Sequence, residues 1–503
     1  MTEFRHLAPR RLSQGLEQNK RIGGTEHRRI HGAFRRRRMR ELLALAEQVD
    51  LRGRGGAAFP FARKVKAVVA AARRRDSQTV VLVNATEGEP ASHKDKFLME
   101  HVPHLILDGA MLAALALGAR EVIIAVTDGA APERSLRAAI AESRLGMMRV
   151  VRLPERFITG EGGALVNGVN GKQAIPPGKK VRAAESGVDG LPTLLSNAET
   201  FAQLTLLSQL GADLYAAIGT EHEPGTRLLT VWGPHGKPIV VEAPSGVPLA
   251  QVLDLCDTGV GQGVLIGGYH GTWLTPGSAN RATVSREGID RVGGALGAGI
   301  ILPLDPEVCP LGEVARVATY LGGESARQCG PCRLGVPAIA RSMQALASGV
   351  SASEAMAGVL QGSQVVKKRG ACHHPDGSAR FVTSALEVFG EDVATHLSSG
   401  TCGRKVRGLL PIAGDVPAPD RTEDSGMRLT VDWSRCAGHS LCGHLVPDLV
   451  KLDENGFPVI AGGAGGAVPT RLLADAQEAV DMCPALALRL HSTQTEAPRA
   501  ARH

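Results

Sequence analysis

TVVLVNATEGEP, residues 79–90, is the stretch of this chain that decides its fold. It opens with an apolar run rich in β-branched side chains, Val80–Val83, and then turns polar. Such a run, bounded by polar residues, predicts a buried β-strand. Asn84, Glu87 and Lys94 follow at or just after the carboxyl end of that strand.

The residues that follow alternate between helical and strand-like patterns. PHLILDGAMLAALALGA (103–119) and PERSLRAAIAESR (132–144) have helical periodicity, whereas EVIIAVTDG (121–129) and MMRVVRLP (147–154) resemble the first strand. This alternation predicts a parallel sheet with helices on its faces. Ligands of such sheets bind at the carboxyl ends of the strands, so we expect the polar residues after the first strand to line a site. A helix cap and a surface ion pair are the alternative roles for these residues.

Glycine-rich turns flank this sheet. RGRGGAAFP (52–60) includes Gly53 and Gly55, and Lys64 follows it. Glycine lets the backbone approach a phosphate closely, and a lysine adds positive charge; a plain loop is the alternative. Two further polar segments are FITGEGGALVNGVNGK, which contains Glu161, and LPTLLSNAETF, which places Asn197 beside a helix start.

The remaining sequence indicates several domains, as expected for 503 residues. Short strands divided by Gly and Pro predict a β-grasp-like domain, and a helical pattern with cysteines in its turns predicts a helical bundle. The expected boundaries are 1–45 for a mobile basic arm and a helix, 46–222 for the α/β domain, 223–302 for the β-grasp-like domain, 303–410 for the helical domain, 411–426 for a linker, 427–490 for a compact ferredoxin-sized α+β domain and 491–503 for a tail.

Composition limits the class of protein. The net charge is +7, with basic runs at 35–40 and 73–75. We interpret these runs as solvated or partner-facing, because no aromatic residues are interleaved for base stacking; nucleic-acid binding is the alternative. No apolar run predicts a membrane span or a signal peptide. Nine cysteines in metal-like spacings favour reduced thiols and a cytoplasmic location.

Two cysteine patterns point to iron–sulfur chemistry. Cys329 and Cys332 form a C-x-x-C pair. The pattern Cys436-x2-His439-x2-Cys442, completed by a distant Cys483-Pro484, is close to the spacing that wraps a cubane-type cluster. A zinc site is the alternative, but structural zinc prefers paired C-x2-C hooks. We interpret Cys256, Cys309 and Cys402 as structural thiols.

Six motifs in order carry a family resemblance: LRGRGGAAFP, VNATEGEP, KDKFLMEHVPH, ITGEGGAL, LPTLLSNAET and ESARQCGPCRLG. From about residue 30 to about residue 400 the chain is similar to the NADH- and FMN-binding 51 kDa flavoprotein subunit of respiratory complex I. The same module occurs in NAD-dependent formate dehydrogenases and hydrogenases. The resemblance implies FMN in the α/β domain, NAD(H) above the flavin and a cluster in the helical domain.

The resemblance also assigns roles to individual residues. It implies that Glu161 is the acidic residue near the nicotinamide. The other implied contacts are Gly53, Gly55 and Lys64 for phosphate, Asn84, Glu87 and Asn197 for the flavin, and Phe59 for stacking on the dinucleotide.

This sequence departs from the family pattern at several points. Thr86 stands for an Asp, Gly162 stands for a second Glu, and PPGKK (176–180) replaces an aromatic motif. The two lysines of PPGKK suit an extra phosphate, so NADP(H) is the alternative nucleotide. A protein that has lost nucleotide oxidation and serves as an electron relay or scaffold is the alternative function.

The cluster motif departs from the family as well. Ala326 stands where the family has its first cysteine, which leaves Cys329, Cys332 and Cys372. Three thiolates suit a [3Fe-4S] cluster, or a [4Fe-4S] cluster whose fourth iron has another ligand. His373 and His374 are neighbouring candidates for that ligand, and a lost cluster with buried thiols is the remaining alternative.

The C-terminal domain resembles small single-cluster bacterial ferredoxins that serve cytochrome P450 enzymes, in which a residue such as His439 replaces the middle cysteine. The resemblance implies a cluster, commonly [3Fe-4S], on Cys436, Cys442 and Cys483. We therefore expect an electron-transfer flavoprotein that oxidises NAD(P)H and passes electrons through the helical-domain cluster to its own ferredoxin. A quinone-linked partner, a ferredoxin or a P450 is the expected acceptor, and a thioredoxin-like [2Fe-2S] protein is an expected partner; neither nucleic acid nor membrane insertion is expected.

Overall fold

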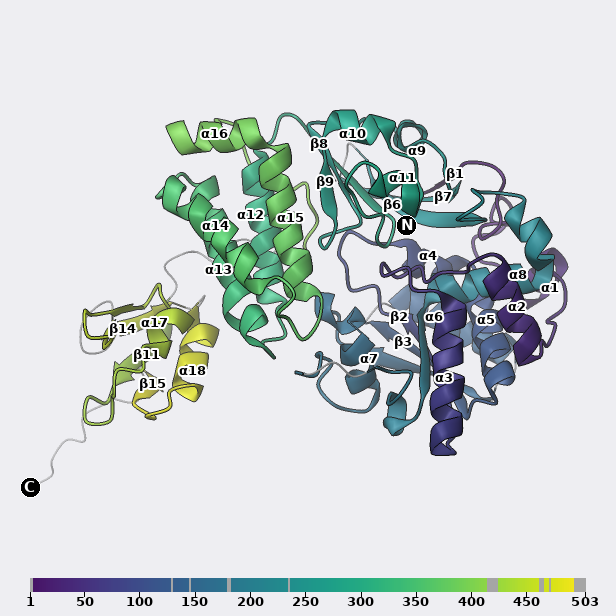
Figure 1. Ribbon diagram of the computed structural model, residues 1–503, viewed down its shortest axis with the longest axis horizontal. Helices are drawn as coiled ribbons and strands as arrows, with labels where there is room; N and C mark the ends of the chain where they lie inside the picture. Colours follow the sequence, from purple (N-terminus) through teal and green to yellow (C-terminus); the bar gives the residue numbers. More distant parts are fainter. Residues whose placement is uncertain are drawn as a thin grey trace, which may run out of the picture. The chain divides into compact units, whose positions relative to one another are not determined.

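The chain folds into two compact units, Met1–Ile412 and Ala413–His503, each described separately below (Figure 1). The computed structural model describes residues 3–127, 130–143, 146–178, 182–233, 236–413, 424–460, 466–469 and 472–492. None of the helices within these ranges is both long and apolar enough to cross a membrane.

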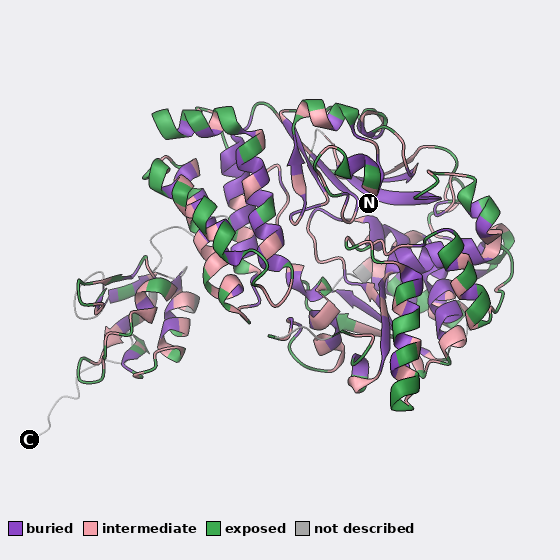
Figure 2. Ribbon diagram, in the orientation of Figure 1, coloured by how far each residue is buried: buried purple, intermediate pink, exposed green. Residues whose placement is uncertain are grey.

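A four-stranded parallel sheet forms the centre of the first unit and confirms the expected α/β fold. Its strand order is β4-β3-β2-β5. The strands are β2 (Val80–Ala85), β3 (Glu121–Thr127), β4 (Met148–Leu153) and β5 (Thr193–Asn197). The apolar runs of β2 and β3 are buried because helices cover the sheet (Figure 2). β3 and β5 lie on opposite sides of β2. The direction in which strands are added to the sheet therefore reverses at the boundary between β2 and β5. A crevice at such a switch point is the usual ligand site of an open α/β sheet.

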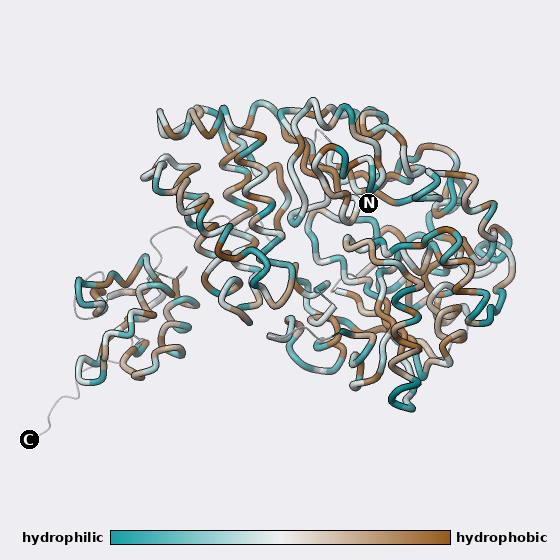
Figure 3. Tube along the Cα trace, viewed as in Figure 1, coloured by the Kyte–Doolittle hydropathy of each residue, from teal (hydrophilic) through white to brown (hydrophobic). Residues whose placement is uncertain are grey.

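Helices pack closely around this sheet. α5 and α8 make a tight contact, because a Cβ added at Gly109 of α5 would lie 1.9 Å from the carbonyl oxygen of Phe201 on α8. The last turn of α3 is hydrophilic (teal in Figure 3), because it contains Arg73, Arg74 and Arg75. The helices of this region are α1 (Gly24–His31), α2 (Met39–Gln48), α3 (Phe61–Arg75), α4 (Lys94–His101), α5 (Pro103–Leu117), α6 (Ala130–Ser143), α7 (Gly162–Val169) and α8 (Ala198–Ala216).

A second, mixed sheet of six strands follows, in the order β1-β7-β6-β10-β8-β9. Its edge strand β1 comes from the N-terminus, where the sequence predicts a mobile arm, and that prediction is wrong for residues 3–6. Four residues are too few to show a period, and β1 is held by a distant strand, β7. The strands are β1 (Glu3–His6), β6 (Thr226–Trp232), β7 (Pro238–Pro244), β8 (Gly263–Ile266), β9 (Thr272–Leu274) and β10 (Ile300–Leu304), and the helices are α9 (Leu249–Leu255), α10 (Pro276–Arg281) and α11 (Arg286–Asp290).

The buried carboxylate of Glu242 on β7 fixes the rest of this N-terminal segment. It accepts hydrogen bonds from the backbone N–H groups of Arg11, Leu12 and Ser13, at 2.8–3.0 Å. Glu242 also accepts one from the Thr226 hydroxyl. A buried carboxylate needs several such donors, so residues 11–13 are ordered by a partner that lies more than two hundred residues away.

A helical region completes the first unit. Hydrophobic and hydrophilic residues alternate along its helices (brown and teal in Figure 3), and their apolar faces share one core. Cys329 and Cys332 lie between α12 and α13, and Cys372 lies between α14 and α15. The elements are α12 (Pro310–Gly323), η3 (Pro331–Gly335), α13 (Val336–Ala347), α14 (Ala352–Val366), α15 (His374–Val388) and α16 (Gly390–Ser399).

The second unit is small and largely antiparallel. β11 lies between β14 and β15 in a three-stranded sheet, and β12 pairs with β13. Two short helices pack on a core that includes Cys442 and Cys483. The elements are β11 (Asp424–Val431), α17 (Leu441–Leu445), β12 (Val450–Leu452), β13 (Pro458–Ile460), β14 (Gly466–Pro469), α18 (Leu473–Asp481) and β15 (Leu488–Ser492).

Candidate flavin and iron–sulfur sites

The glycine-rich loop at 52–58 meets the carboxyl end of the parallel sheet. A Cβ added at Gly55 would lie 3.1 Å from the Cβ of Asn197, the residue that ends β5 and caps α8. Gly56 has a φ of +103° and faces the backbone of Gly297 and Ala298, in the loop before β10. The loop therefore lies at the switch point between β2 and β5. The N–H groups of Gly53 and Arg54 already donate to Phe59 and Thr200, so the N–H groups of residues 55–58 are the candidates for binding an anion.

The predicted residues on this loop have different surroundings. The Lys64 ammonium donates to the carbonyl of Leu195 on β5 (3.0 Å), and burial lowers its pKa. Gly53 donates its N–H to the carbonyl of Phe59, which closes the loop. The Phe59 side chain is 46% exposed, so it is accessible for stacking on a ligand.

A buried network of charged side chains lies next to the glycine-rich loop at 52–58. Lys94 contacts Asp95 at 2.9 Å and Glu199 at 3.0 Å, and Asn197 donates to Asp95 at 2.6 Å. Burial raises the pKa of Asp95 to about 6, although Lys94 opposes this shift. Burial also favours a higher pKa for Glu199. The positive charges of Lys94 and Arg54 have the larger effect, so the pKa of Glu199 is lowered. The network fixes the amide of Asn197 at the sheet edge.

Asn84 and Glu87 are both held by protein groups. Asn84 donates its side-chain N–H to the carbonyl of Gly160 (3.0 Å), and its oxygen accepts from the Thr86 hydroxyl (2.8 Å). Thr86, which stands for the family Asp, thus orients Asn84. The Glu87 carboxylate accepts from the backbone N–H groups of Asp95 and Lys96, so it serves the start of α4. The helix-cap alternative describes Glu87 in this structure.

Glu161 begins α7. Its Oε2 accepts from the N–H groups of Gly163 (2.9 Å) and Ala164 (3.4 Å). This fixes the carboxylate at the end of the η1 turn, Phe157–Gly160, next to the carbonyl that Asn84 contacts. The lysines of PPGKK lie outside the described residues.

The thiols of Cys329, Cys332 and Cys372 come together in the helical region. They share one small apolar cluster, composed of Ile158, Ile175, Ala326, Cys329, Cys332 and Cys372. The N–H of Arg327 points at the sulfur of Cys332 (3.3 Å), and that of Ala371 points at the sulfur of Cys329 (3.5 Å). Burial raises the pKa of the Cys372 thiol to about 11, so a metal must displace its proton.

This donor set fits a cluster held by three thiolates. Ala326 fills the fourth position and is 7% exposed. His374 does not complete the set, because its Nδ1 contacts His270 (3.0 Å) and its Nε2 contacts the carbonyl of Leu321 (2.9 Å). His373 is exposed. Backbone N–H groups directed at sulfur are typical of iron–sulfur sites, where they tune the potential.

The cluster cysteines lie against the segment that carries Glu161. Phe157 donates its N–H to the Glu324 carboxylate (2.8 Å), and its ring packs edge-on against Tyr320. Glu161 is close enough to Cys372 to act on its titration. The predicted nicotinamide side of the flavin site and the predicted cluster are therefore neighbours, although about 200 residues separate them in the chain.

The second unit holds its own three thiols. Cys436, Cys442 and Cys483 line one small pocket together with His439. The N–H of Ala487 points at the sulfur of Cys483 (3.3 Å), and burial together with the other two thiols raises the pKa of Cys442. This donor set fits a cluster that is bound within the unit itself.

Three family models match the chain. Residues 46–206 match the Nuo51 FMN-binding domain, residues 313–396 match the iron-sulfur binding region of NADH-ubiquinone oxidoreductase-F, and residues 429–490 match a 4Fe-4S single cluster domain. The chain thus carries the FMN-binding and iron–sulfur binding regions of the 51 kDa subunit of complex I, followed by a single-cluster domain. Its cofactors are accordingly FMN and iron–sulfur clusters.

The chain is similar to subunits of NADH-quinone oxidoreductases. The one of Mycobacterium tuberculosis is 27% identical over 407 residues, which cover 75% of this chain and 89% of the relative. One of Rhizobium meliloti is 27% identical over 386 residues, 72% of this chain and 90% of the relative. A solved NAD+-reducing [NiFe]-hydrogenase in its air-oxidized state shares the fold, with a TM-score of 0.66, 23% identity, and coverage of 79% of this chain and 68% of that chain.

Glu89 is a residue of the flavin region for which the sequence predicts no role. Its carboxylate accepts a hydrogen bond from the N–H of Tyr269 (3.0 Å) and lies against Gly268, so it links the flavin region to the six-stranded sheet. Burial raises its pKa to about 8. The only available signal was a second Glu in EGEP, two residues after Glu87.

The raised pKa of Glu89 predicts a pH dependence of stability. The folded-state pKa lies above the unfolded value of about 4.3, so folding takes up a proton and the free energy of unfolding falls as pH rises from about 4.3 to about 8, by up to about 1.4 kcal/mol per pH unit. Glu89→Gln keeps the hydrogen-bond acceptor without the charge. We expect its stability relative to the native protein to rise between pH 5 and pH 8 in denaturant titrations; a difference independent of pH contradicts the assignment.

Proposed function

We propose that this chain oxidises a reduced nicotinamide nucleotide and delivers its electrons, one at a time, from the α/β domain through the helical region to the C-terminal unit and a partner acceptor. The observation that supports this best is the contact between the segment of Glu161 and the cluster of Cys329, Cys332 and Cys372. A hydride donor site and a one-electron acceptor site are useful only at short range. The names of the relatives, which are subunits of NADH-quinone oxidoreductases, agree with this proposal.

When bound, FMN accepts a hydride and the clusters carry single electrons. The proposed roles of the protein groups follow from their positions. Gly53, Gly55 and Lys64 hold phosphate at the switch point, and Asn84 and Asn197 orient the flavin ring through fixed amides. Phe59 stacks on the dinucleotide, and Glu161 lies by the nicotinamide with its carboxylate immobilised by α7.

The other parts of the proposal concern the route of the electrons. We infer that region 223–302 is the β-grasp-like module of the family and that it covers the loop at 52–58 through Gly297 and Ala298. The added C-terminal unit supplies the next acceptor. Because it is covalently attached, its effective concentration is high, and transfer to it does not depend on encounter of separate proteins.

Composition of the purified protein tests the proposal. Anaerobically purified full-length chain should contain FMN, iron and sulfide, and its flavin absorbance should bleach on addition of NADH or NADPH. Comparison of the two nucleotides decides between NAD(H) and NADP(H). A brown protein without flavin, or a flavin that neither nucleotide reduces, contradicts the proposed oxidation and favours the relay function.

The C-terminal unit is expected to bind its cluster alone. All three thiols and His439 lie within it, and it has its own hydrophobic core. A fragment from Gly426 to Ser492, reconstituted with iron and sulfide, should be folded by circular dichroism and brown, with an EPR signal that reports the cluster type. A folded fragment that takes up no iron contradicts the assignment of Cys436, Cys442 and Cys483.

A further inference from the structure

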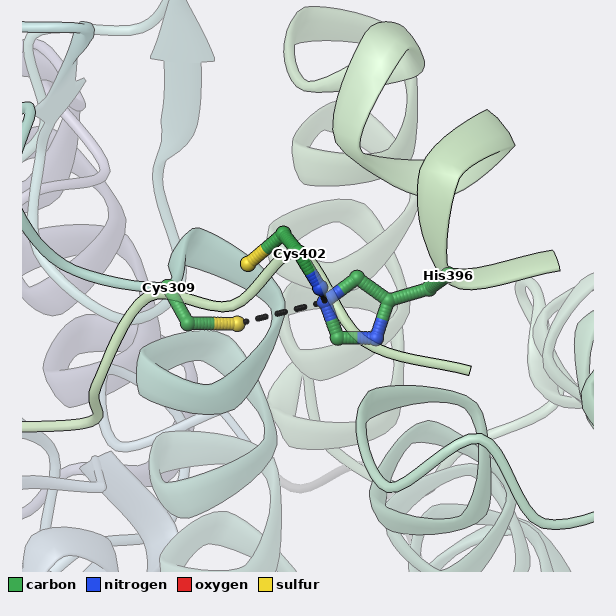
Figure 4. A group of neighbouring side chains, drawn as sticks. All are labelled: Cys309, His396 and Cys402. Carbon is green, nitrogen blue, oxygen red and sulfur yellow. Dashed lines mark hydrogen bonds between the residues drawn. The ribbon is translucent and has the colours of Figure 1, made fainter. Parts of the chain in front are cut away.

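We propose that Cys309, His396 and Cys402 bind a zinc ion at the far end of the helical region. The two sulfurs and the His396 Nε2 all lie within 4.8 Å of one another, with Nε2 3.4 Å from the sulfur of Cys309 (Figure 4). A tetrahedral zinc with Zn–S near 2.3 Å and Zn–N near 2.0 Å sets its sulfur and nitrogen ligands about 3.6 Å apart. Cys309, His396 and Cys402, here called the zinc triad, are therefore already near ligand spacing.

The zinc triad is separate from both cluster sites. Cys309 caps the N-terminal end of α12, whereas Ala326 and Cys329 follow its C-terminal end. The 14 residues of α12 separate the two sites by about 20 Å. Iron–sulfur assembly at Cys329, Cys332 and Cys372 therefore gives no reason for two further thiols and an imidazole to converge here.

The local fold holds each member of the triad in place. The sulfur of Cys309 accepts from the N–H of Gly312 (3.3 Å), and its own N–H donates to the carbonyl of Lys405 (3.0 Å). His396 lies in the last turn of α16, and Gly400 with a φ of +74° reverses the chain so that Cys402 faces the ring. Because the site is preformed, binding of an ion costs little conformational entropy.

The His396 ring points to a ligand. It is 1% exposed, and Nε2 faces Cys309 and the N–H of Cys402 (3.2 Å). Nδ1 is buried and makes no hydrogen bond to any described residue. Nε2 is the ring atom that faces both cysteines, so it is the ligand atom of the proposed site. A cation there would replace the hydrogen bond from the Cys402 N–H and leave the proton on Nδ1.

The chemistry of the donors selects zinc. Two thiolates and one imidazole form a soft to borderline set with tetrahedral geometry, which suits Zn²⁺ better than Mg²⁺ or Ca²⁺. Both thiols lose their protons when the ion binds. A water molecule or another small ligand completes the fourth position.

Zinc at this place would fix the segment that leaves the helical region. Residues 402–410 return to the start of α12, where the buried Glu313 accepts from the N–H groups of Arg407 and Gly408, each at 2.7 Å. The ion joins the same segment to α12 through Cys402 and Cys309. Zinc has no redox chemistry, so it would anchor the tether to the C-terminal unit without diverting electrons.

Metal analysis of the full-length chain tests this site. We expect about one zinc per chain after chelation of loosely bound metal, and X-ray absorption at the zinc edge should show two sulfur ligands near 2.3 Å and a nitrogen ligand near 2.0 Å. Cys402→Ser and His396→Asn should each lower the zinc content at least tenfold and leave FMN unchanged. Two matched controls, Cys256→Ser in the core of the six-stranded sheet and Cys329→Ser in the cluster site, should keep zinc.

Three outcomes overturn the proposal. One is native protein that lacks zinc or holds iron at this site by the same spectroscopy. Another is retention of zinc by Cys402→Ser. The third is a Cys309–Cys402 disulfide, found by mass spectrometry of protein alkylated during anaerobic denaturation, because oxidised sulfurs are not zinc ligands. The spectroscopy uses the native protein, so it decides the question even where a variant fails to fold.

Discussion

Cys329→Ser should leave the flavin site intact and stop electron flow out of it. The change removes one of three thiolates, and with Ala326 in the fourth position only two would remain. Removal of a residue that hydrogen-bonds to a metal ligand lowers metal affinity or activity about 10- to 100-fold. Removal of a ligand itself should lower them at least as much. We expect the purified variant to lose the iron of this cluster and to reduce its C-terminal cluster at least tenfold more slowly, while NADH bleaches the flavin at the native rate.

The matched control is Cys256→Ser. Cys256 is a free thiol like Cys329, but it is buried in the core of the six-stranded sheet and belongs to neither cluster site. Its iron content and transfer rate should equal those of the native chain. Equal transfer rates in Cys329→Ser and the native protein would show that electrons bypass the helical region, and the route through Cys329, Cys332 and Cys372 would then be wrong.

Gly55→Leu should strongly weaken flavin binding. A Cβ at this position already lies 3.1 Å from the Cβ of Asn197, so a larger side chain must displace either the loop or the capped end of α8. Overpacking of this kind costs about 1–3 kcal/mol, and the displaced loop also withdraws its N–H groups from the phosphate. We expect FMN affinity to fall about 10- to 100-fold or more, measured as flavin retained on purification and by titration of apoprotein.

Gly259→Leu is the control with the same change in a different place. A Cβ at Gly259 meets no atom within 4 Å, and the residue lies far along the chain from the loop at 52–58. This variant should keep FMN at the native level. Full flavin content in Gly55→Leu would mean that the glycine-rich loop does not form the phosphate cradle.

The parallel sheet could be predicted because its strands are continuous apolar runs, such as Val80–Val83, that local periodicity reveals. The meeting of Asn84 and Asn197 at one edge of the sheet could also be predicted, because the carboxyl ends of parallel strands lie together. β1 could not be predicted, since a strand of four residues is too short to show a periodic pattern and is held by pairing with the distant strand β7. The helix-capping role of Glu87 was only an alternative, because a carboxylate after a strand suits a ligand or a helix start equally well.

The cysteines show the same limit. Cys329 and Cys332 form a C-x-x-C pair, so their shared site could be predicted from spacing. Cys309, His396 and Cys402 carry no motif, because 87 residues separate Cys309 from His396 and the fold alone brings them together. The contact between Ile158, three residues before Glu161, and the cluster site likewise depends on how the α/β and helical regions pack, which no local pattern encodes.

The most direct test of the proposed electron path is anaerobic stopped-flow mixing of the native chain with NADH or NADPH, with flavin and cluster absorbance followed separately and rapid-freeze EPR used to distinguish the two clusters. The account predicts that the flavin is reduced first, the Cys329 cluster second and the C-terminal cluster last, within one turnover and at rates independent of protein concentration. A C-terminal cluster that stays oxidised after the flavin is reduced, or that is reduced at a rate proportional to protein concentration, would contradict an internal path from the flavin to the fused ferredoxin unit.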